Sequence, residues 1–297
     1  MRFVSPPPLC PGDKICIIAP CGPFDRTLLL RGAGFIGEKF RVEFDWRVFT
    51  RHGYLAGTDA ERLAELNRAL RSEDVRAIVA ARGGFGSTRI VSLADWSAFA
   101  QRPKWIVGFS DVTALHVEAA RLGVASIHGH NAAGLGRGDA AARELWRQCL
   151  EAPTARRSYS GLARWRAGRT TGLLAGGNLT LLSACAEAGR LRLPQGCVLA
   201  IEDVGEAPYR IDRMLTALFC SGALDSVAGV VVGDFVDCNG RFGVAVEDVL
   251  RERLELLRVP VLAGLPFGHG RHNHPLALGL PAAIDGTSGT FTLCPDD

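Results

Sequence analysis

The sequence predicts an α/β protein, with a parallel sheet in its first half and a smaller α/β region in its second. Short apolar runs of strand length alternate with amphipathic helical patterns over the first 150 residues, which is typical of parallel sheets. A polar, arginine-rich stretch follows at 151–171, and the alternation then resumes. The chain has 297 residues, 47% of them apolar, enough for two ordinary domains. We therefore expect domains at 1–150 and 172–297, joined by a linker at 151–171.

The elements of the first half follow from periodicity and from helix-start signals. The clearest is the amphipathic segment TDAERLAELNRALR at 58–71, in which Thr58 is a candidate N-cap. A second helical pattern covers 26–40. Strands are expected at five further segments: 14–19, 42–48, 75–80, 105–107 and 124–128.

The second half repeats the pattern with fewer elements. Strands are expected at 173–175, 198–201 and 227–232, and helices from about 178, at 209–219 and at 247–257. The C-terminal stretch reads as short strands with glycine-rich turns, and the chain contains no internal repeat.

Composition excludes several classes of protein. The net charge is only +3, and the basic residues are scattered rather than gathered in a stripe, so nucleic-acid binding is not expected. No apolar run approaches the roughly 20 residues of a membrane span, and no secretory signal is recognisable. We expect a cytoplasmic protein with no membrane association.

The nine cysteines do not predict a disulfide framework. Their number is odd and no CxxC pair occurs. Cys16, Cys185 and Cys197 stand in apolar runs, as small buried residues do in a reducing compartment.

The segment WIVGFSDVTALH at 105–116 is the first candidate for chemistry. A strand pattern ends at Gly108, Ser110 and Asp111 follow, and a helical pattern then begins. Ligands of open α/β sheets gather at the carboxyl ends of the strands, where a helix start offers free N–H groups. Ser110 could be a nucleophile there, or Ser110 and Asp111 could simply cap the helix.

A glycine-rich loop, ARGGFGS at 81–87, follows another expected strand. Its glycines permit positive φ and close approach to a ligand. A phosphate cradle, an oxyanion loop and a tight turn all remain open, although neither common nucleotide motif fits.

Two polar segments of the second half complete the candidates. Glu202 lies in AIEDVGE at the end of an apolar strand, where it could orient a histidine or belong to a solvated acidic loop. His269, His272 and His274 share a glycine-rich loop. One of them could be a general base, or these residues and the pair His128 and His130 could bind metal, although no HExxH-type frame supports it.

Taken together and in this order, the segments resemble one family: the LD-carboxypeptidases, or murein tetrapeptide carboxypeptidases, of serine peptidase family S66. The resemblance covers nearly the whole chain. It rests on Gly12-Asp13-Lys14-Ile15 with Ala19-Pro20, Arg82-Gly83-Gly84-Phe85-Gly86, Gly108-Phe109-Ser110-Asp111, His128-Gly129, Gly176-Gly177-Asn178-Leu179, Glu202-Asp203 with Tyr209, Asp212 and Arg213, and Gly268-His269.

The resemblance implies a flavodoxin-like N-terminal domain, a smaller α/β C-terminal domain and a catalytic triad of Ser110, Glu202 and His269. The backbone N–H of Asp111, with one from the loop Gly84, Phe85 and Gly86, would form the oxyanion hole. A carboxypeptidase must also hold the free carboxylate of its substrate, for which Arg82 and Arg271 are candidates.

The family resemblance further implies release of terminal D-Ala from murein tetrapeptides in cytoplasmic peptidoglycan recycling, without a metal or cofactor, by an expected homodimer. Phe85 stands where the family commonly has Tyr, Cys21 where it has Ser, and His130 where it has Pro. These departures leave the exact substrate open. The alternatives are the microcin C immunity peptidases of the same family, a metal-dependent hydrolase using the histidine clusters, and a non-catalytic binding protein.

Overall fold

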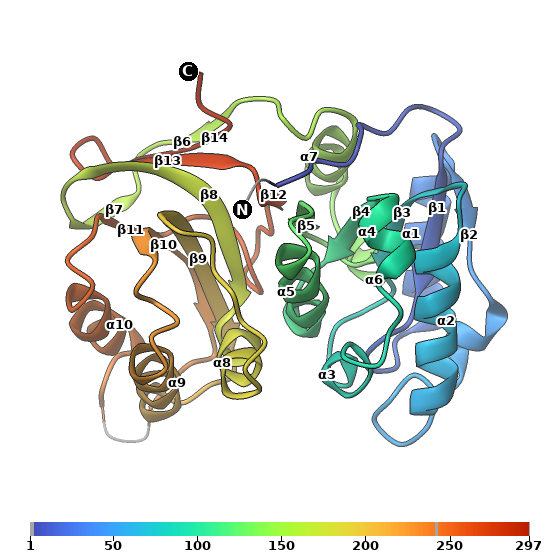
Figure 1. The fold of residues 1–297 in the computed structure, drawn as a ribbon, viewed down its shortest axis with the longest axis horizontal. Helices are drawn as coiled ribbons and strands as arrows, with labels where there is room; N and C mark the ends of the chain where they lie inside the picture. Colours follow the sequence, from blue (N-terminus) through green and yellow to red (C-terminus); the bar gives the residue numbers. More distant parts are fainter. Residues whose placement is uncertain (1–2, 241–242, 297) are drawn as a thin grey trace. The chain divides into compact units, whose positions relative to one another are not determined.

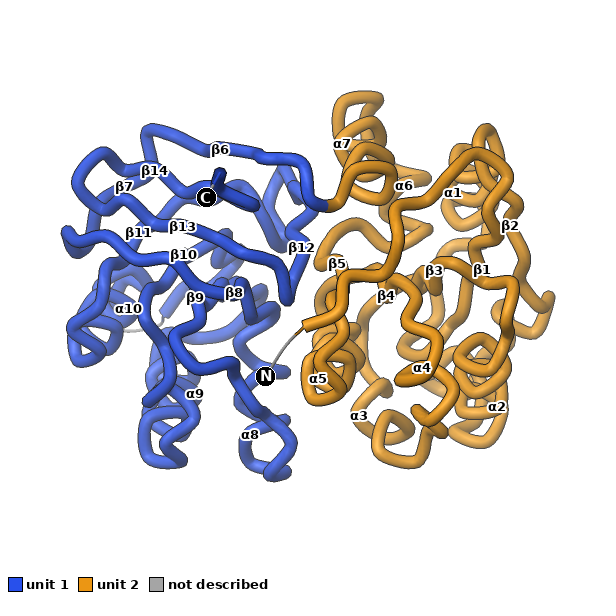
Figure 2. Tube along the Cα trace, turned by 45° about the horizontal axis from the view of Figure 1, so that its top comes forward, with its two compact units in different colours: residues 1, 154–297 blue, residues 2–153 orange. Residues whose placement is uncertain are grey.

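A computed structural model describes residues 3–240 and 243–296 (Figure 1). The chain divides between Pro153 and Thr154 into two compact units (Figure 2). We refer to them as the N-terminal unit and the C-terminal unit, and describe each by itself.

The N-terminal unit contains a parallel sheet in which strands run in the order β2-β1-β3-β4-β5. This is the flavodoxin-like order, and it confirms the fold expected for this half. The strands are β1 (Lys14–Ile18), β2 (Arg41–Glu43), β3 (Val75–Ala80), β4 (Trp105–Gly108) and β5 (Ser126–His128).

Register places the carboxyl ends of the central strands at one edge of this sheet. Ile18 pairs with Ala80, and Gly108 pairs with His128. The loops that follow β1, β3, β4 and β5 therefore leave the sheet at the same edge.

Helices connect the strands of this unit. They are α1 (Arg26–Gly37), η1 (Trp46–Phe49), α2 (Asp59–Arg71), α3 (Ser87–Ile90), α4 (Ser97–Gln101), η2 (Ser110–Val112), α5 (Thr113–Arg121), α6 (Ala132–Arg137) and α7 (Ala140–Glu151). Helices α1 and α6 approach closely, because a Cβ on Gly32 would lie 1.8 Å from the carbonyl oxygen of Ala132.

The sequence located most of these elements correctly. Thr58 caps α2, and Glu61 returns the bond to the Thr58 N–H, which completes a capping box. The strand expected at 42–48 is wrong beyond Glu43. There the Asp45 carboxylate accepts from the Arg47 N–H and starts the 3₁₀ helix η1, so a local side-chain bond overrides the alternating pattern.

The C-terminal unit contains an eight-stranded mixed sheet in the order β6-β14-β13-β8-β9-β10-β11-β7. Strands β8, β9, β10 and β11 are parallel, and antiparallel strands flank them on both sides. The eight strands are β6 (Arg157–Tyr159), β7 (Ala163–Arg166), β8 (Arg169–Asn178), β9 (Cys197–Val204), β10 (Val227–Val236), β11 (Val261–Ala263), β13 (Pro281–Asp285) and β14 (Thr290–Leu293). This half also contains β12 (Leu276–Leu278), which does not belong to that sheet. Its helices are α8 (Leu179–Glu187), α9 (Pro208–Cys220) and α10 (Val246–Glu255).

The structure gives the segment 151–171 a different role from the expected linker. It contains β6, β7 and the start of β8, which belong to the C-terminal sheet. Strands β6 and β7 are the two edges of that sheet, and none of their residues is fully buried. Edge strands with so little buried surface carry no strong apolar periodicity, so this sequence resembles a connection.

The three cysteines predicted to be buried, Cys16, Cys185 and Cys197, are buried in the structure. Burial raises the pKa of Cys16 and Cys197 to about 12. Within residues 3–240 and 243–296, no helix combines the length and apolar character needed to cross a membrane.

Candidate active site

Ser110 lies at a sharp turn at the carboxyl edge of the N-terminal sheet. Its φ is 66°, a left-handed conformation that is unfavourable for a side chain with a Cβ by about 1–2 kcal/mol. Strand β4 ends at Gly108, and η2 leads from Ser110 directly into α5. Strain of this kind concentrates at functional sites, where the surrounding structure enforces it.

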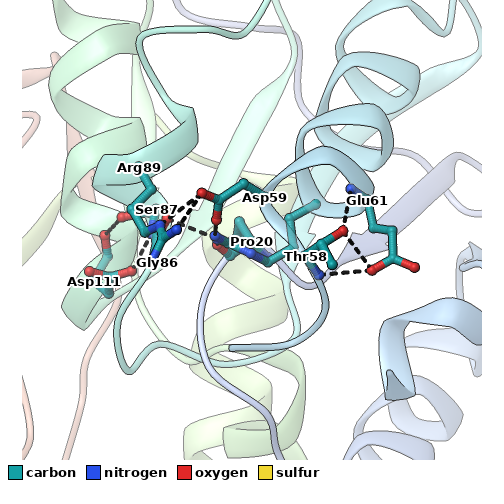
Figure 3. Close-up of polar contacts among 9 residues, drawn as sticks. Pro20, Thr58, Asp59, Glu61, Gly86, Ser87, Arg89 and Asp111 are labelled. Carbon is teal, nitrogen blue, oxygen red and sulfur yellow. Dashed lines mark hydrogen bonds and ion pairs between the residues drawn. The ribbon is translucent and has the colours of Figure 1, made fainter. Parts of the chain in front are cut away.

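The cap positions are occupied by other residues. Phe109 precedes η2 and Val112 precedes α5, and neither makes a side-chain capping bond. Asp111 instead turns its carboxylate toward the glycine-rich loop, where it accepts from the Ser87 N–H at 2.8 Å (Figure 3). The Ser87 hydroxyl donates in return to the Asp111 carbonyl at 2.6 Å. Asp111 therefore locks two loops together, a role that the local sequence did not reveal.

Burial raises the pKa of Asp111, whose side chain is almost wholly inaccessible, while the Ser87 N–H bond opposes that rise. The neighbouring Cys21 thiol is buried as well. Burial raises the pKa of Cys21 well above its usual range, so Cys21 is an inert packing residue rather than a nucleophile.

The glycine-rich loop after β3 lies directly against the serine turn. A Cβ built on Gly83 would lie 2.8 Å from the Ser110 Cβ, so only glycine fits there. Gly84 and Gly86 have φ of 107° and 131°, which side chains rarely adopt. Phe85 is 47% exposed and its ring lies 5.8 Å from that of Tyr54.

Arg82 is exposed at the start of this loop. Its Nη1 donates to the Pro23 carbonyl at 2.7 Å, and nearby the Gly22 N–H donates to the Gly83 carbonyl. The candidate carboxylate clamp therefore also holds the loop after β1 against the loop after β3.

Two polar side chains hold the end of β4 immediately before Ser110. His116 bridges the Gly108 carbonyl through Nε2 and the Ser126 hydroxyl through Nδ1, both at 2.9 Å. Asn131 accepts from the Phe109 N–H at 3.2 Å. The sequence did not identify either residue, because their partners lie on other strands and loops.

Glu202 and His269 meet in the C-terminal unit. Glu202 is on β9 with no exposed surface, and its Oε2 lies 2.6 Å from Nδ1 of His269. Gly268 makes this contact possible, because a Cβ there would lie 2.7 Å from Glu202. The contact excludes a solvated acidic loop and supports the role of Glu202 as the acid that orients a histidine.

The adjacent Asp203 has a separate structural role, since successive strand residues face opposite sides. Its carboxylate accepts from the Asn178 side chain and from the N–H and hydroxyl of Thr180, all within 2.9 Å. It thereby fixes the start of α8, and burial raises its pKa.

The remaining histidines do not assemble a metal centre in the described part of the chain. His272 and His274 have ring centroids 6.2 Å apart, but no group of three His, Cys, Asp or Glu side chains in that part could hold an ion. Arg271 is exposed on the same loop. The neighbouring Gly270 packs directly against the Asp234 carboxylate, since a Cβ there would lie 2.2 Å from Asp234 Oδ2, and this contact helps fix the loop that carries His269.

The N-terminal unit thus contains a strained serine turn beside a glycine-rich loop, and the C-terminal unit contains a buried glutamate–histidine pair. Comparison with known proteins identifies the family of the chain. The profile of the LD-carboxypeptidase N-terminal domain matches residues 15–129, and that of the LD-carboxypeptidase C-terminal domain matches residues 171–284. The chain belongs to the LD-carboxypeptidase family, peptidase family S66, and is a serine peptidase of that family.

Individual relatives span nearly the whole chain. The murein tetrapeptide carboxypeptidase of Pseudomonas aeruginosa is 33% identical over 288 residues, covering 92% of this chain and 93% of the relative. The crystal structure of the muramoyltetrapeptide carboxypeptidase of Oxalobacter formigenes matches with a TM-score of 0.84 at 29% identity, covering 94% of this chain and 97% of that one. The microcin C7 self-immunity protein of Escherichia coli is 26% identical, covering 94% of this chain and 92% of the relative.

Gly83→Ala tests the packing of the loop on Ser110. The added methyl group meets the Ser110 Cβ and must displace the loop or the serine, so we expect peptidase activity to fall roughly 10- to 100-fold. Activity and thermal unfolding are measured together. Gly34→Ala on α1, where a Cβ meets nothing within 4 Å, is the control and keeps full activity. Equal activity in both variants would contradict the close packing of Gly83 on Ser110.

His116→Gln tests the acid sensitivity of the serine turn. Burial lowers the pKa of His116 to about 3, so between pH 6.5 and pH 3 the unfolded chain binds a proton that the folded chain does not. Stability therefore falls as the pH falls through this window, by about 2 kcal/mol between pH 8 and pH 5.

Calorimetry of the wild type and the variant at pH 8 and pH 5 measures this contribution. Glutamine keeps a donor for the Gly108 carbonyl without titrating, so the variant should lose less Tm on acidification, by about 5 °C. His52→Gln, at an exposed position, is the control and should follow the wild type. If acidification lowers the Tm of His116→Gln as much as that of the wild type, the acid sensitivity does not come from His116.

Proposed function

We propose that this protein is a metal-independent serine LD-carboxypeptidase that releases the terminal D-Ala of murein tetrapeptides, with Ser110, Glu202 and His269 as its triad. The observation that carries the proposal is the 2.6 Å contact between buried Glu202 and Nδ1 of His269. A carboxylate on Nδ1 fixes the tautomer in which Nε2 is the basic nitrogen, as a serine nucleophile requires.

The reaction follows from these roles. Ser110 Oγ attacks the carbonyl carbon of the scissile L,D-peptide bond while His269 accepts the hydroxyl proton. The tetrahedral intermediate collapses as His269 returns the proton to the leaving amine of D-Ala. Water, deprotonated by His269, then attacks the acyl-enzyme carbonyl, and the ester bond breaks as His269 returns this proton to Ser110 Oγ. Glu202 stabilises the imidazolium formed in both steps.

The oxyanion is assigned to backbone donors on two loops. The Asp111 N–H follows the nucleophile directly, and an N–H of the segment Gly84, Phe85 and Gly86 would supply the second donor. The bonds between Asp111 and Ser87 support this assignment, because they hold the two loops in fixed register.

Recognition of the substrate's terminal carboxylate is assigned to Arg82 or Arg271. Both are exposed arginines on loops that carry proposed catalytic groups, and a guanidinium suits a carboxylate. The preference for murein tetrapeptide rests on the named relative from Pseudomonas aeruginosa. Action as a cytoplasmic homodimer in wall recycling rests on family membership.

Hydrolysis of a microcin-type peptidyl nucleotide is the second candidate. The self-immunity relative spans nearly the whole chain, and the exposed Phe85 and Tyr54 rings offer a stacking surface for a base. The fold is common to both activities, so the substrate must be tested directly.

The triad is tested by Ser110→Ala, Glu202→Gln and His269→Ala. We expect Ser110→Ala and His269→Ala to lower kcat at least about 1000-fold and Glu202→Gln less, with KM little changed. Release of D-Ala is followed by mass spectrometry, and Ser288→Ala on an exposed turn is the matched control. Wild-type activity in Ser110→Ala would overturn the nucleophile assignment.

Two further measurements separate the rival functions. The wild type should retain full activity in a chelator, whereas inhibition with rescue by zinc would favour the metal-dependent hydrolase. Murein tetrapeptide and an aminoacyl sulfamoyl adenosine are then compared by kcat/KM. We expect the tetrapeptide to be preferred; a preference for the nucleotide assigns the microcin activity, and binding without product assigns a binding protein.

A further inference from the structure

Arg62 is an arginine buried inside the N-terminal unit, in the first turns of α2. Its side chain is 1% exposed. A buried guanidinium is unfavourable unless its N–H groups and its charge are matched, so its partners indicate why it is there.

Its partners lie on the two loops that leave β1 and β3. Nη1 of Arg62 donates to the Pro20 carbonyl and to the Gly86 carbonyl, the latter at 2.8 Å. Pro20 follows β1, and Gly86 is the last glycine of the glycine-rich loop after β3. In the sheet order β2-β1-β3-β4-β5, the strand order reverses between β1 and β3. Open α/β sheets bind their ligands at such a topological switch point.

Asp59 supplies the balancing charge. Its Oδ1 lies 2.5 Å from Nη2 of Arg62, and its Oδ2 accepts from Nε of Arg89 at 2.8 Å. These bonds, chiefly that from Arg89, lower the pKa of Asp59. The side chain of Arg89 is 44% exposed and bonds to Asp59, whereas its backbone N–H donates to the Gly86 carbonyl at 3.2 Å. Replacing only this side chain keeps the backbone bond, so Arg89 offers a matched comparison on the same carboxylate.

The glycine-rich loop is consequently anchored at both ends. At its start the Gly83 carbonyl accepts from the Gly22 N–H, and Gly83 packs on Ser110. At its end Gly86 is held by Arg62, and Ser87 is held by Asp111. A Cβ on Gly86 would lie 2.7 Å from Nη1, so the fit around the guanidinium is close.

We propose that Arg62 is a positioning residue for catalysis: by joining the Pro20 and Gly86 carbonyls, it sets the direction of the loop N–H groups that face the reacting oxygen. It acts through the loop and does not touch the substrate. Arginine is required because one planar guanidinium reaches two carbonyls and a carboxylate together, which a lysine ammonium on a flexible stem does not reproduce. This inference rests on the proposed function, since it assumes an oxyanion formed at Ser110.

The test uses Arg62→Lys and Arg62→Ala in the full chain. A fluorophosphonate probe reports the rate of Ser110 phosphonylation, and kcat and KM are measured with murein tetrapeptide about 20 °C below each variant's Tm. In each variant we expect the phosphonylation rate and kcat to fall about 10- to 100-fold, with KM changed less than about 3-fold. The reason is that misdirected backbone N–H donors weaken transition-state stabilisation. Arg89→Gln should stay within about 2-fold of the wild type.

Methylguanidinium provides the decisive readout for Arg62→Ala. Bound in the space left by the side chain, it should restore at least a tenth of the lost phosphonylation rate, and methylammonium at equal concentration should not. Because the rates are measured well below the Tm, a loss that neither cation restores assigns Arg62 to stability alone and overturns the proposal.

The remaining outcomes are distinguishable. If the wild type is not labelled at Ser110, the proposed function fails, whatever the variants do. If the wild type is labelled and Arg62→Lys reacts at the same rate, only the positioning role fails. Where Arg62→Ala does not fold, Arg62→Lys decides by itself, because it keeps the buried charge that Asp59 balances.

Discussion

The left-handed backbone of Ser110 is the constraint on which the N-terminal site depends. An unfavourable φ persists only where neighbouring groups leave no alternative. Here Gly83 packs on the serine, His116 and Asn131 hold the strand end before it, and Asp111 bonds to Ser87 after it. Much of the polar structure at the carboxyl edge of this sheet therefore serves to keep one side chain in one direction.

In the C-terminal unit the corresponding constraint is the burial of two carboxylates. Glu202 and Asp203 are adjacent acids on one strand, and both are almost inaccessible. The strand turns them to opposite faces, so that Glu202 meets His269 while Asp203 satisfies the start of α8. Each carboxylate is stabilised by its own polar partners, because unpaired charges are rarely found at such depth.

Glycine has a specific use at both places. Gly83 and Gly268 permit contacts with Ser110 and Glu202 that a Cβ would block. A single sequence marks such glycines only as turn formers, since the partner that requires them is far away along the chain. The same limitation explains why Arg62, within an ordinary amphipathic helix, gave no sign of its contacts with Pro20 and Gly86.

The sequence by itself determined what depends on near neighbours: the capping box of α2, the strand and helix periods, and the motifs that indicate the family. It misassigned 42–48 and 151–171, where a local side-chain bond and two edge strands weaken the periodic signal. Only the tertiary structure decided that Asp111 bonds to Ser87, that Glu202 is buried against His269, and that Arg62 joins two loops. Those contacts depend on strand order and register, which bring together residues that local periodicity cannot relate.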